Sequence, residues 1–280
     1  MAISSASLAY RRIALMNATK VTVKPPSEEV LKARDNFQDF CKLMGKAPAK
    51  HMLEWHAQLC TGEDTECLIG IGGPNTSILA PRGSAKSTVL GLFAAWMIGR
   101  HAAAKQMLRI LYIAYMVDIS RAKSATIKGI LTSAKYREIF PMVRLSKIKR
   151  SDEYWSIDYE FAGIDTAGEE AFTIACGGLK GAITSKRSQL VLIDDPIKSA
   201  ASINNPDIRR EMEQTWSNVI APTMFQGARA ICLGTRFHFD DIHATLFIPK
   251  NKWKQIVQRA VITDADGKQR SYRPEFWSMK

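Results

Sequence analysis

Residues 76–88 have the sequence TSILAPRGSAKST, and TVLGLFAAWMIGRHA covers 88–102. TSILA predicts a short buried strand, PRGSAKS predicts a turn, and the second segment predicts a strongly apolar helix. A strand, a turn with Gly, Lys and Ser, and a helix are typical of a phosphate-binding loop, whose usual pattern is G-x-x-x-x-G-K-[ST]. Ala80 and Ala85 stand here at the two outer glycine positions. Because the pattern is short, a chance turn is the alternative that it leaves open.

The chemistry of a phosphate-binding loop survives these two replacements. Gly83 allows the backbone to bend where a Cβ atom would clash. The amides of the loop can then point at phosphate oxygens, and the N-terminus of the following helix favours an anion. Lys86 supplies a positive charge for the β- and γ-phosphates, and the Ser87 hydroxyl supplies a magnesium ligand. The predicted cofactors are therefore ATP and Mg²⁺, held by Gly83, Ser84, Ala85, Lys86, Ser87 and Thr88.

A second apolar strand, QLVLIDD at 189–195, ends in two carboxylates. They emerge at the carboxyl edge of the predicted sheet, where open α/β sheets bind ligands. Neighbouring residues on a strand point to opposite faces, so the two carboxylates need different roles unless the chain turns sharply there. We predict that Asp194 holds magnesium through water and that Asp195 orients and deprotonates the attacking water. An Asx turn before Pro196 is the structural alternative.

A third buried strand, ARAICLGT at 228–235, is followed by Arg236. In an ATPase this strand end lies near the γ-phosphate, so Thr235 and Arg236 are predicted to sense it. Further strands are predicted at 109–115 and 171–176, and helices at 28–44, 50–60, 118–135 and 206–220. Apolar strands that alternate with helices predict a parallel sheet covered on both faces.

The chain has 280 residues, and its 39 Lys and Arg against 27 Asp and Glu give a net charge of +12. This excess favours a polyanionic partner such as nucleic acid, with a basic solvated surface as the alternative. The candidates for phosphate contacts to DNA are Lys123, Lys128, Lys147, Lys149 and Arg150. Five scattered cysteines without a CxxC pair indicate reduced thiols. No apolar run reaches the ~18 residues that a membrane span needs.

Four segments, in this order, resemble the ATPase domain of the large terminase subunit, the DNA-packaging motor of tailed bacteriophages. They are HMLEWHAQL (51–59), APRGSAKST (80–88), LVLIDDPIKSA (190–200) and LGTRFHFDDI (233–242). The resemblance implies an α/β fold, a P-loop NTPase of the additional-strand type with a mainly parallel central sheet and helices on both faces. It divides the chain into an N-terminal basic arm and helix (1–45), the ATPase domain (46–260) and the start of a linker (261–280). That linker would lead to a nuclease domain, which we expect this chain to lack.

The resemblance also implies roles for single residues. Arg82 would contact the nucleotide or link the phosphate state to movement, and Asp195 would take the place of the catalytic carboxylate. Thr235 would belong to the motif that couples hydrolysis to DNA movement. His51 and Trp55 match a segment near the adenine base, with helix packing as the equal alternative. Members of the family receive an arginine finger from a neighbouring subunit. The candidates here are Lys180 and Arg187.

The implied function is an ATP-hydrolysing motor that moves double-stranded DNA into a viral procapsid. Its implied partners are DNA, the portal protein, the small terminase subunit and further copies in a homo-oligomeric ring, predicted to be a pentamer. Its implied location is the host cytoplasm and, transiently, the portal vertex of the procapsid. Two alternatives stay open: a nucleic-acid helicase, and a capsid-vertex adaptor that binds nucleotide without turnover. A small-molecule kinase gains no support from the charge of +12.

Overall fold

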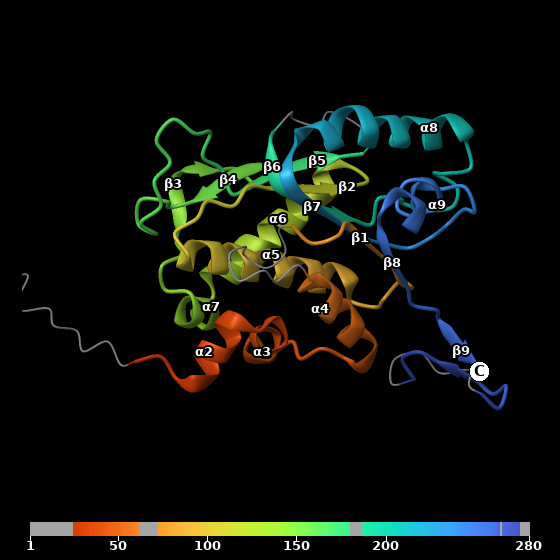
Figure 1. Cartoon of the computed structure of the whole chain (residues 1–280), viewed down its shortest axis with the longest axis horizontal. Coiled ribbons are helices and arrows are strands. Elements are labelled where there is room, and N and C mark those ends of the chain that lie inside the picture. The colour runs from red at the N-terminus through yellow and green to blue at the C-terminus, as the bar shows by residue number, and fades with distance from the viewer. Residues whose placement is uncertain (1–24, 62–71, 180–185, 264, 275–280) are drawn as a thin grey trace, which may run out of the picture.

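The computed structural model describes residues 25–61, 72–179, 186–263 and 265–274. Its centre is an eight-stranded sheet with the strand order β3-β4-β5-β2-β6-β7-β1-β8 (Figure 1). In this order, the six neighbouring strands β5, β2, β6, β7, β1 and β8 pair in parallel. Strands β3 and β4 pair in an antiparallel manner at the other edge, and β4 is also antiparallel to β5. The predicted mainly parallel sheet is thus confirmed. The strands are β1 Thr76–Leu79, β2 Ile110–Ala114, β3 Leu145–Arg150, β4 Tyr154–Ile157, β5 Ile174–Gly178, β6 Ser188–Asp194, β7 Met224–Gly234 and β8 Lys254–Val257.

The order of the strands defines the class of the fold. Strand β7 lies between β1, which leads into the loop at 80–85, and β6, which ends at Asp194. An inserted strand at this place is the feature of the additional-strand P-loop fold, as predicted. The carboxyl ends of three parallel strands consequently meet at one edge of the sheet. Strands in a sheet lie about 5 Å apart, so β1 and β6 are separated by about 10 Å at that edge.

Helices cover both faces of the sheet, because the strand side chains alternate between two apolar clusters. Ile110 and Tyr112 of β2 belong to the larger cluster, and Leu111 and Ile113 belong to the smaller one. The larger cluster packs under α2 Glu28–Asp35, α3 Phe37–Leu43, α4 Leu53–Leu59, α5 Lys86–Ala103, α6 Val117–Thr132 and α7 Ala134–Ile139. The smaller one packs under α8 Pro206–Gln214 and α9 Ile242–Thr245, which Figure 1 shows on the other side of the strands.

Several predicted elements are shorter or divided in the structure. The helix predicted at 28–44 is two helices, because Asn36 adopts an extended conformation (φ −125°, ψ 121°). Its side chain accepts hydrogen bonds from the amides of Gln38 and Asp39, which caps the second helix. Ser133 likewise ends α6 and caps α7. The strand predicted at 171–176 lies at 174–178, and the helix predicted at 206–220 becomes a π-helical turn at Thr215–Ile220.

The N-terminal helices belong to the same core as the sheet. The indole nitrogen of Trp96 in α5 donates to the carbonyl of Ala33 in α2 at 3.1 Å. The ring of Phe37 lies 5.4 Å from the ring of Trp96. The described part of the predicted N-terminal segment therefore packs onto the helix that follows the phosphate loop.

The C-terminal residues return to the loop at 80–85. Strands β9 Val261–Thr263 and β10 Gln269–Ser271 form a separate hairpin. Immediately after it, Arg273 donates from Nη1 to the carbonyl of Gly83 at 3.0 Å. The ring of Tyr272 lies 5.1 Å from that of His51. The segment predicted as the start of a linker thus contacts the phosphate loop.

A fully buried arginine ties the sheet to the segment before β1. Arg229 of β7 has no exposed surface, and burial lowers its pKa to about 10. Its guanidinium donates at 2.9–3.2 Å to the carbonyls of Gln58, Leu59, Thr61 and Pro74 and to the Thr76 hydroxyl. One side chain therefore joins the end of α4, the entry to β1 and the middle of β7.

Replacing Arg229 with alanine is expected to lower the free energy of unfolding by about 3 kcal/mol or more, since several buried acceptors lose their donor. Urea unfolding followed by circular dichroism measures the change. Arg259→Ala is the matched control, because Arg259 is exposed. The control is expected to stay within about 0.5 kcal/mol of the wild type. Equal unfolding midpoints for both variants would contradict the structural role of Arg229.

Stability is also expected to depend on pH through three buried histidines. Burial is the main cause that lowers the pKa of His56, His101 and His243 from 6.5 to about 4. The unfolded chain takes up these protons below a pH of about 6.5, whereas the folded chain takes them up only near a pH of about 4. Their contribution to stability is therefore present above that window and is lost as the pH falls through it.

The thermal unfolding midpoint is accordingly expected to fall as the pH is lowered between these two values. Scanning calorimetry across the window tests this. The variant His101→Gln, which removes one of the three titrating rings, is expected to show a shallower dependence. A midpoint that rises on acidification would show that other groups dominate.

Candidate active site

The loop between β1 and α5 explains both departures from the usual glycine pattern. Gly83 and Ala85 have positive φ angles of 76° and 62°, whereas Ala80 does not. The Ala80 amide donates to the Gly234 carbonyl at 3.0 Å, so this residue continues the sheet, and a Cβ atom is tolerated. At Ala85 the left-handed backbone costs an alanine about 1–2 kcal/mol relative to glycine. The loop therefore has the required turn and carries a small strain at its last position.

The buried carboxylate at the end of β6 faces the first turn of α5. Asp194 is 1% exposed and accepts hydrogen bonds from the Ser87 hydroxyl at 2.8 Å and from the Tyr112 hydroxyl at 3.0 Å. Burial and then the charge of Asp195 raise the pKa of Asp194, while the Ser87 hydrogen bond and the charge of Lys123 act against that rise. The predicted pair of magnesium ligands, Ser87 and Asp194, is therefore in direct contact.

The second carboxylate turns to the same side. Asp195 has a φ of +44°, a left-handed conformation that aspartate tolerates better than most residues. The sharp turn brings its Oδ1 to 3.3 Å from Nζ of Lys86. The Lys86 side chain is 5% exposed and that of Asp195 is 42% exposed. The lysine is thus held inside the loop by a carboxylate that still reaches solvent.

The end of β7 is fastened to the start of the loop. The Thr235 hydroxyl donates to the Ala80 carbonyl at 3.0 Å. Arg236 is exposed, and its guanidinium donates to the carbonyls of His238 and Phe239. Asp241 holds this turn by accepting from the amides of Phe237, His238 and His243. Thr235 therefore contacts the loop directly, while the phosphate-sensing role of Arg236 stays a prediction.

A pocket of about 210 Å³ opens between these strand ends and α6. Arg82 lies at its rim, with Nη2 donating to the Lys198 carbonyl at 2.9 Å and the guanidinium 5.1 Å from the ring centre of Phe237. The lining residues are Arg82, Ser87, Tyr115, Ile119, Lys123, Asp194, Asp195, Ile197, Lys198 and Phe237. The pocket thus combines two carboxylates with three cationic side chains.

The structure places the remaining predicted site residues as follows. Thr88 lies in the first turn of α5. His51 contacts the loop from behind, with Nε2 3.4 Å from the Ser84 carbonyl oxygen. Trp55 is fully buried and lies against His51, with ring centres 5.4 Å apart. Packing under the loop accounts for Trp55, and contact with an adenine base stays a prediction for both residues.

The positions of Lys180 and Arg187 in a single chain do not test whether either residue acts as a finger on a neighbouring subunit. Lys180 lies outside the described residues. Arg187 directly precedes β6 and stacks at 4.7 Å over the ring of Phe225. It therefore sits at the amino end of the strand whose carboxyl end carries Asp194, away from the pocket of its own chain.

Three residues in or beside the site were not predicted as site residues. Tyr112 was hidden inside an apolar strand pattern, and only the parallel register that pairs Ala114 with Asp194 shows that the two strands are neighbours. Arg273 lies 190 residues after Gly83 in the chain, so the sequence gives no local sign of their contact. Lys123 was a candidate for DNA contact, which stays a prediction, and the structure shows that it also lines the pocket. Its spacing of four residues from Ile119 on one helix face was the available signal.

Of the other DNA candidates, two are engaged within the chain. Lys128 pairs with Asp152 at 2.8 Å, and Lys149 donates to the Ala171 carbonyl. Lys147 and Arg150 are exposed on the edge strand β3. Contact with DNA stays a prediction for these residues.

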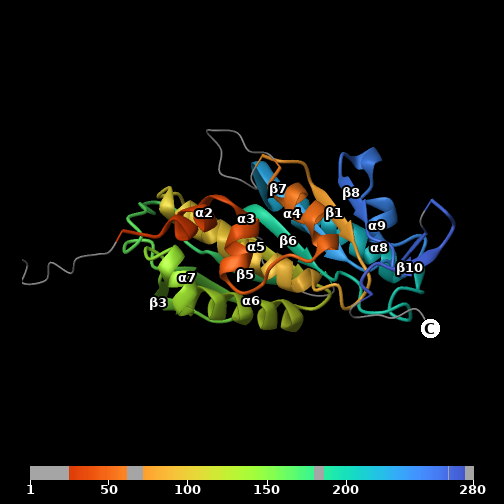
Figure 2. The same cartoon turned by 90° about the horizontal axis from the view of Figure 1, so that it is seen from below.

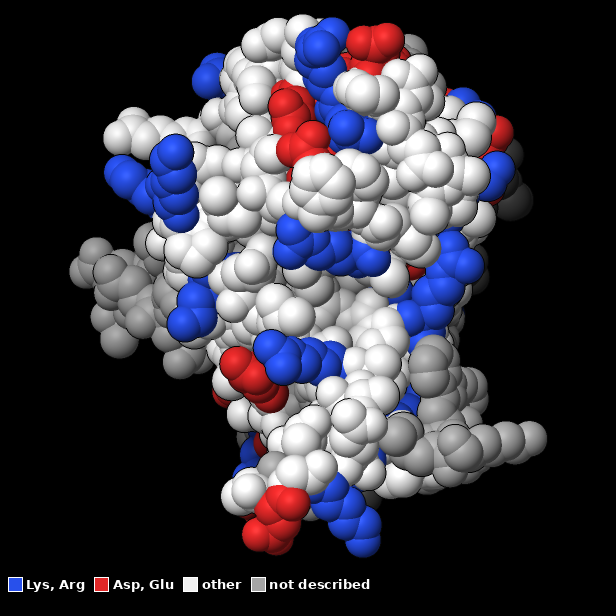
Figure 3. All heavy atoms as spheres, turned by 90° about the vertical axis from the view of Figure 1, so that its right-hand side faces the viewer, with Lys and Arg blue, Asp and Glu red and all other residues white. Residues whose placement is uncertain are grey.

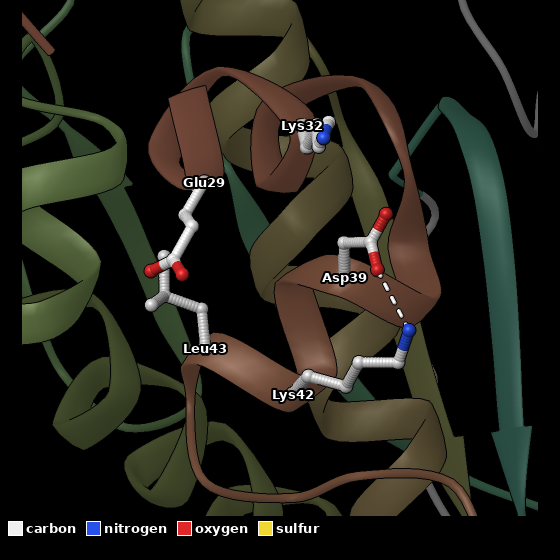
Figure 4. Close-up of a pocket in the computed structure, with 5 residues that line it drawn as sticks. All are labelled: Glu29, Lys32, Asp39, Lys42 and Leu43. Carbon is white, nitrogen blue, oxygen red and sulfur yellow. Dashed lines mark hydrogen bonds and ion pairs between the residues drawn. The ribbon is translucent and has the colours of Figure 1, made fainter. Parts of the chain in front are cut away.

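Larger hollows than this pocket do not carry comparable chemistry. One of about 330 Å³ lies between α2 and α3 and is lined by Glu29, Lys32, Asp39, Lys42 and Leu43 (Figure 4). Lys42 pairs with Asp39 at 2.8 Å, and Lys32 pairs with Glu28 at 2.6 Å. The opposite charges there compensate one another on the surface. The smaller pocket at the strand ends, with two carboxylates beside the phosphate loop, is therefore the candidate site.

The face at the right-hand side of Figure 1, where α9 and β8 lie, is largely uncharged and carries scattered Lys and Arg side chains with fewer Asp and Glu side chains among them (Figure 3). Within the described ranges, no three His, Cys, Asp or Glu side chains are placed to bind a metal ion together. The described cysteines Cys41, Cys176 and Cys232 are free thiols. In the same ranges every helix is too short or too polar to span a lipid bilayer.

Comparison with known proteins gives similarity in structure alone. No protein-family model matches the chain, and no curated protein matches it either. The ATPase domain of the Thermus phage P74-26 large terminase, in a mutant form, is 15% identical and has a TM-score of 0.46, with 79% of this chain and 85% of that domain covered.

Two further solved structures are similar. The large terminase of a thermophilic bacteriophage, in complex with ATP-gamma-S, is 10% identical with a TM-score of 0.41 over 83% of this chain, and the chain spans 44% of its length. The N-terminal domain of the DNA packaging ATPase of bacteriophage phi29 is 14% identical with a TM-score of 0.35, with 57% of this chain and 72% of that domain covered. Sequence identities and TM-scores this low do not support an argument about chemistry. The solved structures that this chain resembles are ATPase domains of phage large terminases and DNA-packaging proteins.

Proposed function

We propose that this chain is the ATPase domain of a large terminase subunit, a motor that hydrolyses ATP to move double-stranded DNA into a viral procapsid. One observation carries the proposal. Lys86 and Ser87 at the start of α5 contact Asp195 and Asp194 at the end of β6, at 3.3 Å and 2.8 Å. A phosphate loop and two carboxylates are thereby assembled around one small pocket.

The donor set fits a nucleotide with magnesium. The Ser87 hydroxyl gives its proton to Asp194, so its lone pairs stay available for a metal ion. Hydroxyl and carboxylate oxygens are the ligands that Mg²⁺ prefers, and it keeps several waters when bound. Ser87 would ligate the ion directly, and Asp194 would hold it through water. When bound, the ion neutralises charge on the β- and γ-phosphates.

The Lys86–Asp195 pair gives the chain a resting arrangement. When a triphosphate enters the loop, its oxygens compete with Asp195 for the Lys86 ammonium group. Asp195 then loses its partner and is left with its carboxylate in the pocket, where it can orient a water molecule and accept its proton as the oxygen attacks the γ-phosphorus. Arg82, at the rim, adds positive charge near the phosphates.

Coupling to movement is assigned to the end of β7. The Thr235 hydroxyl is bonded to the first residue of the loop, so a shift of the loop on phosphate loss reaches the turn at 236–241 through this bond. The partners in this proposal are duplex DNA, the portal protein, the small terminase subunit and further copies in a ring, taken to be a pentamer. The DNA contacts are to phosphates, because a motor must move any sequence. It works in the host cytoplasm and at the portal vertex.

Phosphate release, measured at rising protein concentration with and without duplex DNA, tests the proposal. Release that grows faster than the protein concentration, and grows further with DNA, is expected if neighbouring subunits complete the site. Nucleotide binding without phosphate release under every condition would instead indicate the capsid-vertex adaptor. Separation of DNA strands by the chain alone would indicate a helicase.

A further inference from the structure

Helix α6 brings a lysine to the pocket from beside α5, the helix that follows the phosphate loop. The helix follows β2 and lies beside α5 (Figure 2). Ile119 and Lys123, four residues apart on α6, line the pocket together with Tyr115, which directly follows β2. Residues four apart share one face of a helix. On its side that faces the pocket, α6 thus presents the apolar Ile119 and one cation, Lys123.

Lys123 differs from the other cations of its helix. Arg121 bonds Asp118 and Glu153, and Lys128 bonds Asp152. Lys123 makes no hydrogen bond or ion pair with any residue that the structure describes, although the residue is half-buried. A lysine that lines the pocket and has no such partner can offer its ammonium group to an anion that enters the pocket.

The other cations in or beside the pocket have partners within the chain or are exposed. Lys86 pairs with Asp195, and Arg82 donates to the Lys198 carbonyl while stacking on Phe237. Lys198 is exposed. Lys123 is near enough to Asp194 for its charge to favour the ionised carboxylate. It therefore lines the same pocket as the two carboxylates.

We propose that Lys123 is a further catalytic residue, whose ammonium group binds the γ-phosphate of ATP and stabilises its charge during hydrolysis. The inference rests on the proposed function. The water oxygen forms the new bond to the γ-phosphorus, Asp195 takes the water proton, and the bond to the bridging oxygen breaks with its electron pair leaving on ADP. Lys123 transfers no proton. It supplies within one chain a positive charge in addition to Lys86, which matches the charge spread over the equatorial phosphate oxygens.

This placement makes Lys123 selective for the third phosphate. A group that binds the γ-phosphate adds affinity for a triphosphate and none for a diphosphate. The variant Lys123→Met keeps an unbranched apolar stem and removes the charge. Its affinity for ATPγS is expected to fall by about tenfold or more, while its affinity for ADP changes by less than about twofold. Its kcat for ATP is expected to fall by about 100-fold.

Calorimetric titration of the purified chain with ATPγS and with ADP, in the same preparation, gives the ratio of the two affinities. The ratio does not depend on the fraction of folded protein, so a partly unfolded variant still answers the question. Lys123→Arg is expected to recover part of the ATPγS affinity. Lys135→Met, which removes an exposed lysine of α7, is the control and is expected to keep the wild-type ratio.

An unchanged ratio in Lys123→Met, or an equal loss for both nucleotides, would overturn the assignment. The outcome is separate from that of the proposed function. A wild-type chain that binds ATPγS more tightly than ADP but never releases phosphate would refute the ATPase, while the ratio would still report on Lys123.

Discussion

Replacing Lys86 with alanine is expected to lower phosphate release by about 100- to 1,000-fold and to remove most of the affinity for ATP. The Lys86 side chain is only 5% exposed and lies inside the loop, so no other cation can take its position. The fold itself is expected to survive. The partner left behind, Asp195, is 42% exposed and can be hydrated when its ion pair is lost.

Binding of a fluorescent ATP analogue and phosphate release, measured on the same sample, test the expectation for Lys86→Ala. The control is again Lys135→Met, which removes a charge from α7 without touching the loop. A melting temperature near that of the wild type establishes that the variant is folded. Retention of full ATP affinity by a folded Lys86→Ala protein would show that nucleotide binds somewhere other than this loop.

The part of the site that was predictable depends on local sequence. The strand, loop and helix at 76–103 follow from a short apolar run, Gly83 and a long apolar helix. The contact between Ser87 and Asp194 followed from two assumptions: that β6 is parallel to β1, and that ligands bind at the carboxyl edge. The parallel direction of the two strands holds in the structure, and it brings Ser87 and Asp194 together. The sharp turn at Asp195 was an open alternative, because sequence does not distinguish a regular strand end from a left-handed aspartate.

The remaining features depend on which strands become neighbours. Tyr112 bonds Asp194 only because β2 pairs with β6, and Lys123 reaches the pocket only because α6 crosses back beside α5. The antiparallel strands β3 and β4 were missed, since a basic, half-exposed segment such as LSKIKR lacks an apolar alternation. Arg273 contacts Gly83 across 190 residues of chain. Tertiary contacts of this kind leave no local signal in a single sequence.

Hydrolysis is expected to fall by about 100- to 10,000-fold in Asp195→Asn, the effect of removing a general base. Nucleotide binding is expected to persist or to strengthen. The change removes one of two neighbouring negative charges from a pocket that must accept a polyphosphate, and it frees Lys86 from its ion pair. Burial and the charge of Asp195 both raise the pKa of Asp194, so removing that charge also favours the ionised form of the remaining carboxylate.

The comparison that identifies the role is between the two carboxylates. Asp194→Asn is expected to weaken the dependence on magnesium, since Asp194 is bonded to Ser87, whereas Asp195→Asn is expected to leave the magnesium requirement for nucleotide binding unchanged. Asp240→Asn removes a carboxylate that pairs with Arg209 outside the pocket and serves as the matched control. Phosphate release and ATP binding measured over a magnesium titration separate the two effects. If Asp195→Asn released phosphate at the wild-type rate, the water-activating group would have to be another residue, and the turn at Asp195 would serve only to hold Lys86 in the loop.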